Sequence, residues 1–243
     1  MGNNTKLAII SDIHANKYAL NSFLQYNEDY FQADKILNLG DCFSIGPNPR
    51  EVVEKITTDK RFVNIIGNNE MIALGKRRSE WRRQKVPHHE WIAEQLGKDL
   101  LGLIEKTPTS KSLDVNGKKV LMLHSHFYDT PGRTIMDNLL IYQGKTLEEF
   151  IEDYPEDVDI ILVGHSHLQL YISWKGKKII NPGSISVTWK PITSFCLLEI
   201  GDDDSVDINF KNIAYDVSKL KNDYIEKNVP GREFLIKYFY PFL

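Results

Sequence analysis

Seven side chains of types that commonly bind metal ions follow short apolar segments of this sequence; they are Asp12, His14, Asp41, Asn68, His124, His165 and His167. A zinc-like site takes about three or four ligands, so seven suit two ions that share a bridging carboxylate, and Asp41 is our candidate for the bridge. Two ions about 3.5–4 Å apart can deprotonate a shared water at neutral pH and neutralise phosphate oxygens during in-line attack. Such chemistry needs no nucleophilic serine or cysteine.

Two pairs of these ligands, Asp12 with His14 and His165 with His167, are spaced two positions apart. In an extended backbone residues i and i+2 point to the same side, so we expect both members of each pair to face one pocket.

Some of the seven residues also have ordinary structural explanations when they are taken singly. Asp12 suits the start of a helix, Asn68 suits a helix cap, and His124 suits a hydrogen-bonded histidine at a strand end. The occurrence of all seven after strands favours the metal site, because the carboxyl ends of strands are where a doubly wound sheet gathers its ligands.

The elements that must position these residues begin with three units of strand, polar loop and helix. Apolar runs at 6–11, 35–39 and 62–66 predict the strands, and each is followed by a loop and a helical pattern. Such units predict a parallel sheet whose loops open on one edge. Residues 75–106 then carry a helical pattern, which we interpret as a cap-like insertion over the sheet edge.

The second half of the chain is predicted to be richer in strands. Asn116-Gly117 suits a type I′ turn that leads into a strand at 119–123. An acidic helix near 146–153 and a fully apolar strand at 160–163 follow. Further runs predict an antiparallel meander, at 168–174, 178–180, 195–200 and 206–213. Because no Gly-, Ser- or Pro-rich linker separates the halves, we expect residues 1–243 to form a single domain.

Composition excludes several functional classes. The 243 residues are 42% hydrophobic and 26% charged, which indicates a globular protein. A net charge of -3 gives no support for a general nucleic-acid or membrane-surface binder. The two cysteines, Cys42 and Cys196, fit no metal or redox spacing, no secretory leader is recognisable, and no apolar run approaches the ~18 residues that span a bilayer. We therefore expect a soluble, cytoplasmic protein.

Five short motifs, taken in order, resemble those of the calcineurin-like metallophosphoesterase superfamily. They are Asp12-Ile13-His14, Gly40-Asp41, Gly67-Asn68-Asn69-Glu70, His124 and Gly164-His165-Ser166-His167. Segments 11–16, 46–49, 181–184 and 214–216 also resemble its small bacterial phosphodiesterase branch, which includes phosphatases, phosphodiesterases and diadenosine tetraphosphate hydrolases.

This resemblance implies an α/β fold, a four-layer α/β/β/α sandwich of two mixed sheets. It implies one metal bound by Asp12, His14, Asp41 and His167, and another bound by Asp41, Asn68, His124 and His165. The family's metals are usually Mn, Fe, Zn or Ni, with Mn and Fe common in bacterial members, and these ligand types do not choose among them.

The implied activity is that of a dinuclear metal-dependent phosphohydrolase, with Asp41, Asn68 and His124 in catalytic roles. Many family members carry a histidine that protonates the leaving group at the position of Asn69, and an amide cannot donate that proton. A positioned acid contributes ~10²- to 10⁴-fold in rate, so we predict activity on activated phosphodiesters or nucleoside polyphosphates above activity on alkyl monoesters. His126 is either a substitute acid or a histidine at the rim of the site.

Candidate substrate contacts lie close to these motifs; they are Asn16, Asn48, Arg50, Asn69, Arg77 and Arg78. The segment 46–49 also suits a simple turn into a helix. Residues 76–85 carry six positive charges and one negative, which fits either a solvated helical face or a site for the far phosphates of an extended anionic substrate.

The expected partner is a small phosphorylated molecule such as a nucleotide, with no membrane and no long nucleic acid. A homo-oligomer stays open, because the aromatic stretch 234–243 suits either packing on the body or self-association. Two alternatives to the diesterase remain: a phosphomonoesterase, and a metal-free scaffold for protein interactions on the same fold.

Overall fold

The computed structural model describes residues 4–76, 82–130, 133–137 and 154–243, with the backbone alone for 82–86, 126–130 and 133–137. Its strands are β1 (Thr5–Ile10), β2 (Lys35–Asn38), β3 (Phe62–Asn64), β4 (Ser110–Val115), β5 (Lys118–Leu123), β6 (His126–Thr130), β7 (Arg133–Asp137), β8 (Ile160–Leu162), β9 (Gln169–Trp174), β10 (Lys177–Pro182), β11 (Ile192–Ile200) and β12 (Val206–Ala214). Its helices are α1 (Lys17–Tyr26), the π-helical turn η1 (Asn27–Phe31), α2 (Pro49–Thr58), α3 (Asn68–Ala73), α4 (Arg82–Glu105), α6 (Val217–Glu226) and α7 (Arg232–Phe239).

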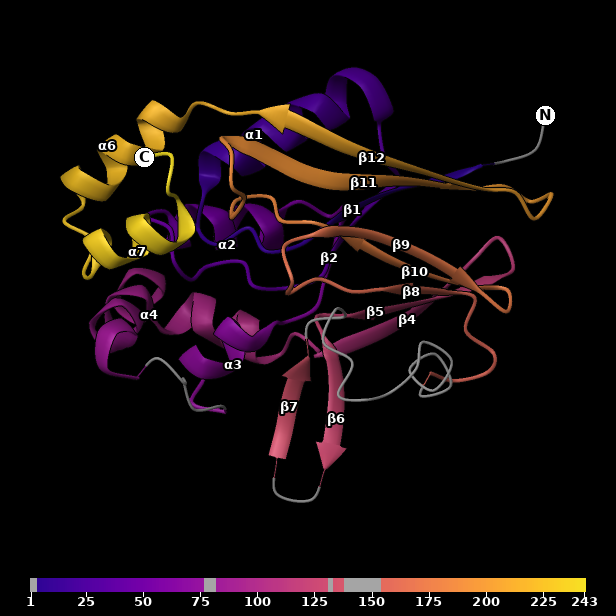
Figure 1. Cartoon of the computed structure of the whole chain (residues 1–243), viewed down its shortest axis with the longest axis horizontal. Helices are drawn as coiled ribbons and strands as arrows, with labels where there is room; N and C mark the ends of the chain where they lie inside the picture. The colour runs from indigo at the N-terminus through magenta and orange to yellow at the C-terminus, as the bar shows by residue number, and fades with distance from the viewer. Residues whose placement is uncertain (1–3, 77–81, 131–132, 138–153) are drawn as a thin grey trace.

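Most of these strands form two mixed sheets (Figure 1). The first has the order β12-β11-β1-β2-β3, and the parallel pairing of β1, β2 and β3 confirms the prediction from the three strand–loop–helix units. The second has the order β4-β5-β8-β10-β9, in which β8 runs parallel to both of its neighbours. The β6–β7 hairpin forms a separate ribbon that projects from the body (Figure 1).

The predicted antiparallel meander at 168–213 is wrong. Its four strands form two hairpins that belong to different sheets: β9–β10 completes the second sheet, whereas β11–β12 joins the first. Strand β11 pairs antiparallel with β1 over Thr5–Ile9. The local turns were predicted well, since Asn116 and Gly117 have φ values of 46° and 78°, as a type I′ turn requires.

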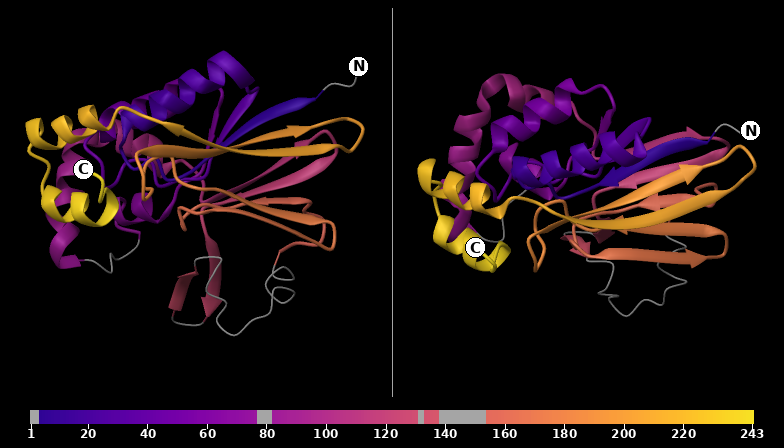
Figure 2. Two further views of the ribbon diagram at one scale, coloured as in Figure 1. Left: turned by 45° about the horizontal axis from the view of Figure 1, so that its top comes forward. Right: turned by 90° about the horizontal axis from the view of Figure 1, so that it is seen from above.

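The apolar core explains why the sheets stack face to face. Alternate residues of β1 face opposite sides: Leu7 and Ile9 pack between the sheets, whereas Ala8 and Ile10 pack against the helices. Strand β8 is apolar throughout because Ile161 contributes to a third cluster on the outer face of the second sheet. Figure 2 shows helices over the first sheet and the second sheet beneath it. These layers confirm the predicted two-sheet α/β sandwich; the helix predicted at 146–153 lies outside the described residues.

Helix α4 occupies most of the segment interpreted as a cap-like insertion. It contacts α2 and α3, and it buries Ile92, Leu96 and Ile104 in the core on the helical side of the first sheet. A break at Gly97, with φ 65°, divides it into two helical segments. The single-domain organisation with a cap over the metal ligands stays a prediction.

The C-terminal aromatic stretch packs on the body. Tyr240, which follows α7, is fully buried, and its hydroxyl lies 2.6 Å from the hydroxyl of Ser186 in the loop between β10 and β11. Leu235 of α7 is also buried. No helix in the described part of the chain is long and apolar enough to cross a membrane.

Candidate metal centre

The seven candidate ligands follow the carboxyl ends of five strands, and hydrogen bonds between the loops bring these ends together. Loops after β1 and β2 are joined where Asp12 N donates to Gly40 O (2.9 Å) and His14 N donates to Asp41 O (2.9 Å). Across the two sheets, His124 Nδ1 donates to Leu39 O at 2.8 Å. Loop geometry therefore places side chains that are far apart in the sequence in one pocket.

The expectation that an extended backbone turns both members of each ligand pair to the same side is wrong, because these segments are not extended. Asp12 and His14 have φ values of 55° and 46°, and His165 and His167 have φ values of 67° and 61°. All four residues lie in the left-handed region, so the side chains of each pair converge through two left-handed residues rather than through the pleat of a strand.

One cluster consists of Asp12, His14 and His167. The Nε2 atoms of the two histidines lie 3.1 Å apart, and Asp12 Oδ1 lies 3.3 Å from His167 Nε2 and 3.6 Å from His14 Nε2. Asp12 and His14 are almost fully buried, whereas the His167 side chain is 23% exposed. The open side of this cluster is therefore the His167 side.

A second cluster consists of Asp41, His124 and His165. Because Nδ1 of His124 faces Leu39, its Nε2 faces the pocket, 3.5 Å from Asp41 Oδ1 and 3.0 Å from Asn68 Oδ1. Asn68, the first residue of α3, thus joins this group through its amide oxygen. The family resemblance assigns these four residues to one metal, and their role as ligands stays a prediction.

The two clusters adjoin each other. The His165 amide of the second cluster donates to Asp12 Oδ2 of the first at 3.0 Å. The positive charges of both His124 and His14 lower the pKa of the Asp41 carboxyl against the effect of burial. The charge of the Asp41 carboxylate is therefore felt by imidazoles of both clusters, and its role as a bridging ligand stays a prediction.

The protonation of this donor set suits metal cations. Burial by itself raises the pKa of the Asp12 carboxyl, but the imidazoles of His167, His124 and His14 lower it to about 2, so the carboxylate is ionised at neutral pH. Burial and the charge of His124 lower the pKa of His165 to about 4, which leaves a neutral ring with a free lone pair. Oxygen and imidazole donors fit Mn, Fe, Zn or Ni.

The carboxylates around His124 favour a positive charge on its imidazole. Burial lowers the pKa of its imidazole, but the carboxylates of Asp41, Asp12 and Glu70 raise it to about 10. A metal cation at Nε2 would supply the same positive charge and release that proton. The residues therefore fit the metal ions that the resemblance implies.

Glu70 is a residue of the site that had no predicted role of its own. Its buried carboxylate accepts hydrogen bonds from three backbone amides, those of Asp41 (2.8 Å), Cys42 (2.6 Å) and Gly67 (2.7 Å). Burial and the charge of Asp41 raise its pKa to about 7, whereas the bonds from Cys42 and Gly67 lower it. Glu70 thus fixes the loop that carries Asp41 to the start of α3. The available signal was its position three residues after Gly67, as in a capping box.

Asn69 is held on the carboxylate of Asp41. Its backbone amide donates to Asp41 Oδ1 at 2.8 Å, and its side-chain amide donates to Asp41 Oδ2. This contact orients a candidate ligand, and a contact of Asn69 with substrate stays a prediction.

Other predicted substrate contacts have structural partners in the described residues. Asn16 is buried, caps α1 through Ala19 N and donates to Ser186. Asn48 is buried and donates to Asp223 at 2.5 Å, whereas Arg50 pairs with Glu54 on the surface of α2. Substrate contacts by these residues stay predictions. Arg77, Arg78 and the side chain of His126 lie outside the described residues.

Comparison with known proteins agrees with this fold. Residues 5–203 match the model of the calcineurin-like phosphoesterase superfamily domain. Because the match spans most of the chain, the protein belongs to this superfamily.

Three relatives extend the comparison over nearly the full length. An uncharacterized protein of Methanocaldococcus jannaschii is 27% identical over 246 residues, which cover 92% of this chain and 93% of that protein. The crystal structure of a metallophosphoesterase from Sphaerobacter thermophilus is 25% identical, with a TM-score of 0.73 and coverage of 98% of each chain. A hypothetical protein from Pyrococcus horikoshii has a TM-score of 0.74 at 18% identity, with coverage of 97% of this chain and 98% of that one, and it shows the shared fold alone.

Proposed function

We propose that this protein is a dinuclear metal-dependent phosphohydrolase that cleaves phosphoric ester or anhydride bonds. The observation that carries the proposal is the pair of adjoining clusters, each with one carboxylate and two imidazoles, at the strand ends of a calcineurin-like phosphoesterase domain. Mn and Fe are the metals we favour, and Zn or Ni would also suit these donors.

Each group of residues has a role in this proposal. Asp12, His14 and His167 would hold one ion, His124, His165 and Asn68 would hold the other, and Asp41 would be the ligand that both share. When bound, the two ions activate a water at neutral pH and stabilise the charge that builds up on phosphate. Asn69 and Glu70 position Asp41, since their hydrogen bonds fix its carboxylate and its backbone.

The preferred substrates carry good leaving groups. Asn69 has no proton to give as an acid, and its side chain is engaged with Asp41. Activated phosphodiesters and nucleoside polyphosphates need the least help from an acid at the leaving oxygen. We therefore propose a small phosphorylated substrate of this kind, such as a nucleotide. Comparable kcat/KM values on an alkyl monophosphate and a bis(nitrophenyl) diester would contradict this preference.

Metal removal and return test the central proposal. The purified protein should contain bound metal, lose hydrolysis of bis(p-nitrophenyl) phosphate in EDTA, and regain it with Mn²⁺. His165→Ala should lose metal and turnover, while His89→Ala, a histidine of α4 outside both clusters, is the matched control. A metal-free interaction scaffold would bind no metal and show no turnover after Mn²⁺ is added.

A further inference from the structure

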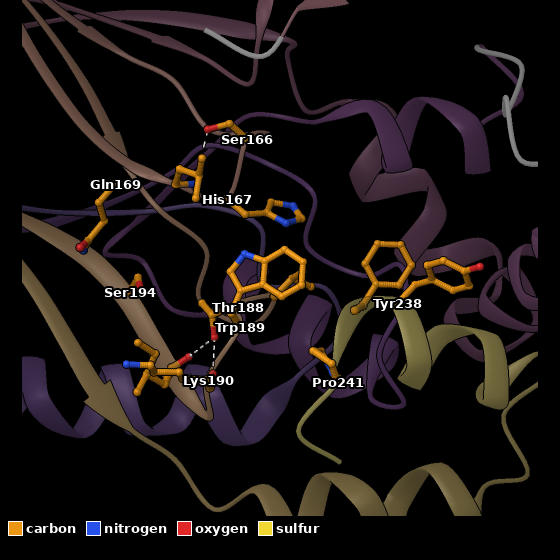
Figure 3. Close-up of a pocket in the computed structure, with 13 residues that line it drawn as sticks. Ser166, His167, Gln169, Thr188, Trp189, Lys190, Ser194, Tyr238 and Pro241 are labelled. Carbon is orange, nitrogen blue, oxygen red and sulfur yellow. Dashed lines mark hydrogen bonds between the residues drawn. The ribbon is translucent and has the colours of Figure 1, made fainter. Parts of the chain in front are cut away.

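A cavity of about 510 Å³ lies directly beside the exposed edge of the candidate metal centre. His167 and Ser166 line one side of it, and the loop between β10 and β11 contributes Trp189. The C-terminal segment contributes Tyr238 and Phe239 of α7. Figure 3 shows the imidazole of His167, the indole of Trp189 and the ring of Tyr238 around the same hollow.

His167 connects this cavity to the candidate metal centre, because it belongs to the first cluster and also lines the cavity. Among the first cluster, His167 is 23% exposed, whereas Asp12 and His14 are at most 1% exposed. A phosphate that reached these ligands from the His167 side would have this cavity beside it, with room for one of its substituents.

The walls of the cavity are tied to the metal centre by hydrogen bonds. Ser184 donates to the backbone carbonyl of Asp12 (2.8 Å) and accepts from the amides of Ser186 (3.1 Å) and Val187 (2.8 Å). The hydroxyl of Ser186 lies 2.6 Å from that of Tyr240, which follows α7. These bonds fix the Trp189 loop and the C-terminal wall relative to the ligand Asp12, so the cavity is preformed.

The aromatic lining is unusually exposed. Trp189 is 79% exposed and Tyr238 is 56% exposed. One exposed aromatic residue is ordinary. Trp189 and Tyr238, however, come from separate elements around one cavity that Phe239 also lines, and together they form a surface on which a planar group can stack.

Three polar residues of the lining are already engaged within the protein. Gln169 donates to two backbone carbonyls and accepts from Asn212, Ser194 donates to Asn212, and the Thr188 hydroxyl donates to backbone carbonyls. Because these three residues are engaged, stacking on the exposed aromatic rings is the contact that the cavity offers most directly to a planar group.

We propose that this cavity is a subsite for one substituent of the substrate phosphate, which stacks a planar aromatic group, an aryl ring or a nucleobase, against Trp189 and Tyr238. This inference rests on the proposed phosphohydrolase function. It narrows the substrate class to aromatic phosphate esters and nucleoside phosphates or polyphosphates.

The test compares two phosphonates that the enzyme cannot hydrolyse as esters. Calorimetry with the full-length, Mn²⁺-loaded protein measures the Kd of phenylphosphonate and of methylphosphonate. We expect phenylphosphonate to bind roughly 5- to 150-fold more tightly, the range that corresponds to stacking of a base on an aromatic side chain. Trp189→Ala and Tyr238→Ala should each reduce this ratio, and Trp189→Phe should preserve most of it. Tyr30→Ala is the matched control, since Tyr30 is an aromatic residue 75% exposed outside the cavity.

The outcomes separate this inference from the function on which it rests. If methylphosphonate binds and the ratio is near one, or is unchanged in both cavity variants, the subsite is refuted and the phosphohydrolase stands. A dimer that Trp189→Ala dissociates, with an unchanged ratio, would assign the indole to a subunit interface and would also refute the subsite. If neither phosphonate binds and no ester is hydrolysed, the proposed function fails and the subsite fails with it.

Discussion

Gly67 lies so close to Asp41 that a single added methyl group should displace this candidate ligand, and the variant Gly67→Ala therefore tests the proposed metal centre. A Cβ atom at this position would lie 2.2 Å from Asp41 Oδ1 and 2.7 Å from the Asp41 amide nitrogen. Real Cβ atoms essentially never come within 3.0 Å of such atoms, so the Asp41 carboxylate must shift by roughly 1 Å. The backbone of Gly67 is extended, with φ -100° and ψ -167°, so alanine adds no conformational strain of its own.

Displacement of Asp41 should affect metal binding more than folding. Ligand distances in metal sites hold to about 0.2 Å, and a misplacement of about 1 Å can reduce a rate ~10²-fold. We therefore expect Gly67→Ala to lower kcat/KM for bis(p-nitrophenyl) phosphate by about 100-fold and the affinity for Mn²⁺ by ~10- to 100-fold. The free energy of unfolding should fall by about 1–3 kcal/mol through overpacking.

Elemental analysis, Mn²⁺ titration, steady-state kinetics and urea unfolding measure these quantities. Gly102→Ala is the control, because a Cβ atom at Gly102 in α4 meets nothing within 4 Å. It should keep full activity and gain ~0.5–1 kcal/mol of stability as an alanine in a helix. A folded Gly67→Ala protein with wild-type metal content and turnover would refute the role of Asp41.

Three further predictions concern positioning and stability. Glu70→Gln should lower stability by ~1–3 kcal/mol and weaken Mn²⁺ binding, measured by urea unfolding and metal titration, because an amide cannot accept from all three backbone amides. The Arg61 guanidinium donates to Asp59 and lowers the pKa of that carboxyl. The stability it adds is complete about one pH unit above the ordinary pKa of 3.8 and declines as pH falls from there toward the lower folded pKa, so the difference in stability between wild type and Asp59→Asn should be largest at pH 7 and smaller at pH 3. Tyr240→Phe, which removes the hydroxyl contact with Ser186, should cost ~1 kcal/mol in thermal unfolding.

Each of these predictions can fail. Tight Mn²⁺ binding by Glu70→Gln would show that Asp41 keeps its place without the Glu70 carboxylate. A constant stability difference between pH 7 and pH 3 would assign the effect of Asp59→Asn to packing rather than to charge. An unchanged melting temperature for Tyr240→Phe would mean that the hydroxyl of Ser186 is satisfied by Asn16 alone.

The sequence predicted the elements that depend on local patterns. Apolar runs and turn residues are local signals, so the strands β1, β2 and β3, their parallel order and the turn at Asn116-Gly117 were predicted correctly. Polar residues directly after those runs identified side chains that the structure brings into two adjoining clusters. Their roles as ligands stay predictions.

The features that the sequence did not predict depend on distant contacts. The hairpins β9–β10 and β11–β12 look alike in sequence, and only the pairing of β11 with β1, far away in the chain, assigns them to different sheets. Glu70 likewise acts on backbone amides 28 and 29 positions away, which no local pattern reveals. Partner choice between strands and loops is a tertiary property, and it overrides local preference.

Backbone strain gives an argument for the metal centre that is independent of ligand type. Among the described residues, twelve that are not glycine have positive φ, and five of them are candidate ligands: Asp12, His14, Asp41, His165 and His167. Each such conformation costs about 1–2 kcal/mol, so the cost of all five is comparable to the ~5–15 kcal/mol by which a typical domain is stable. Backbone hydrogen bonds between the loops hold the strain in place, as in the bond from His14 N to Asp41 O. Strain of this size persists where function requires one geometry, and here it is concentrated in residues whose side chains converge on a single pocket.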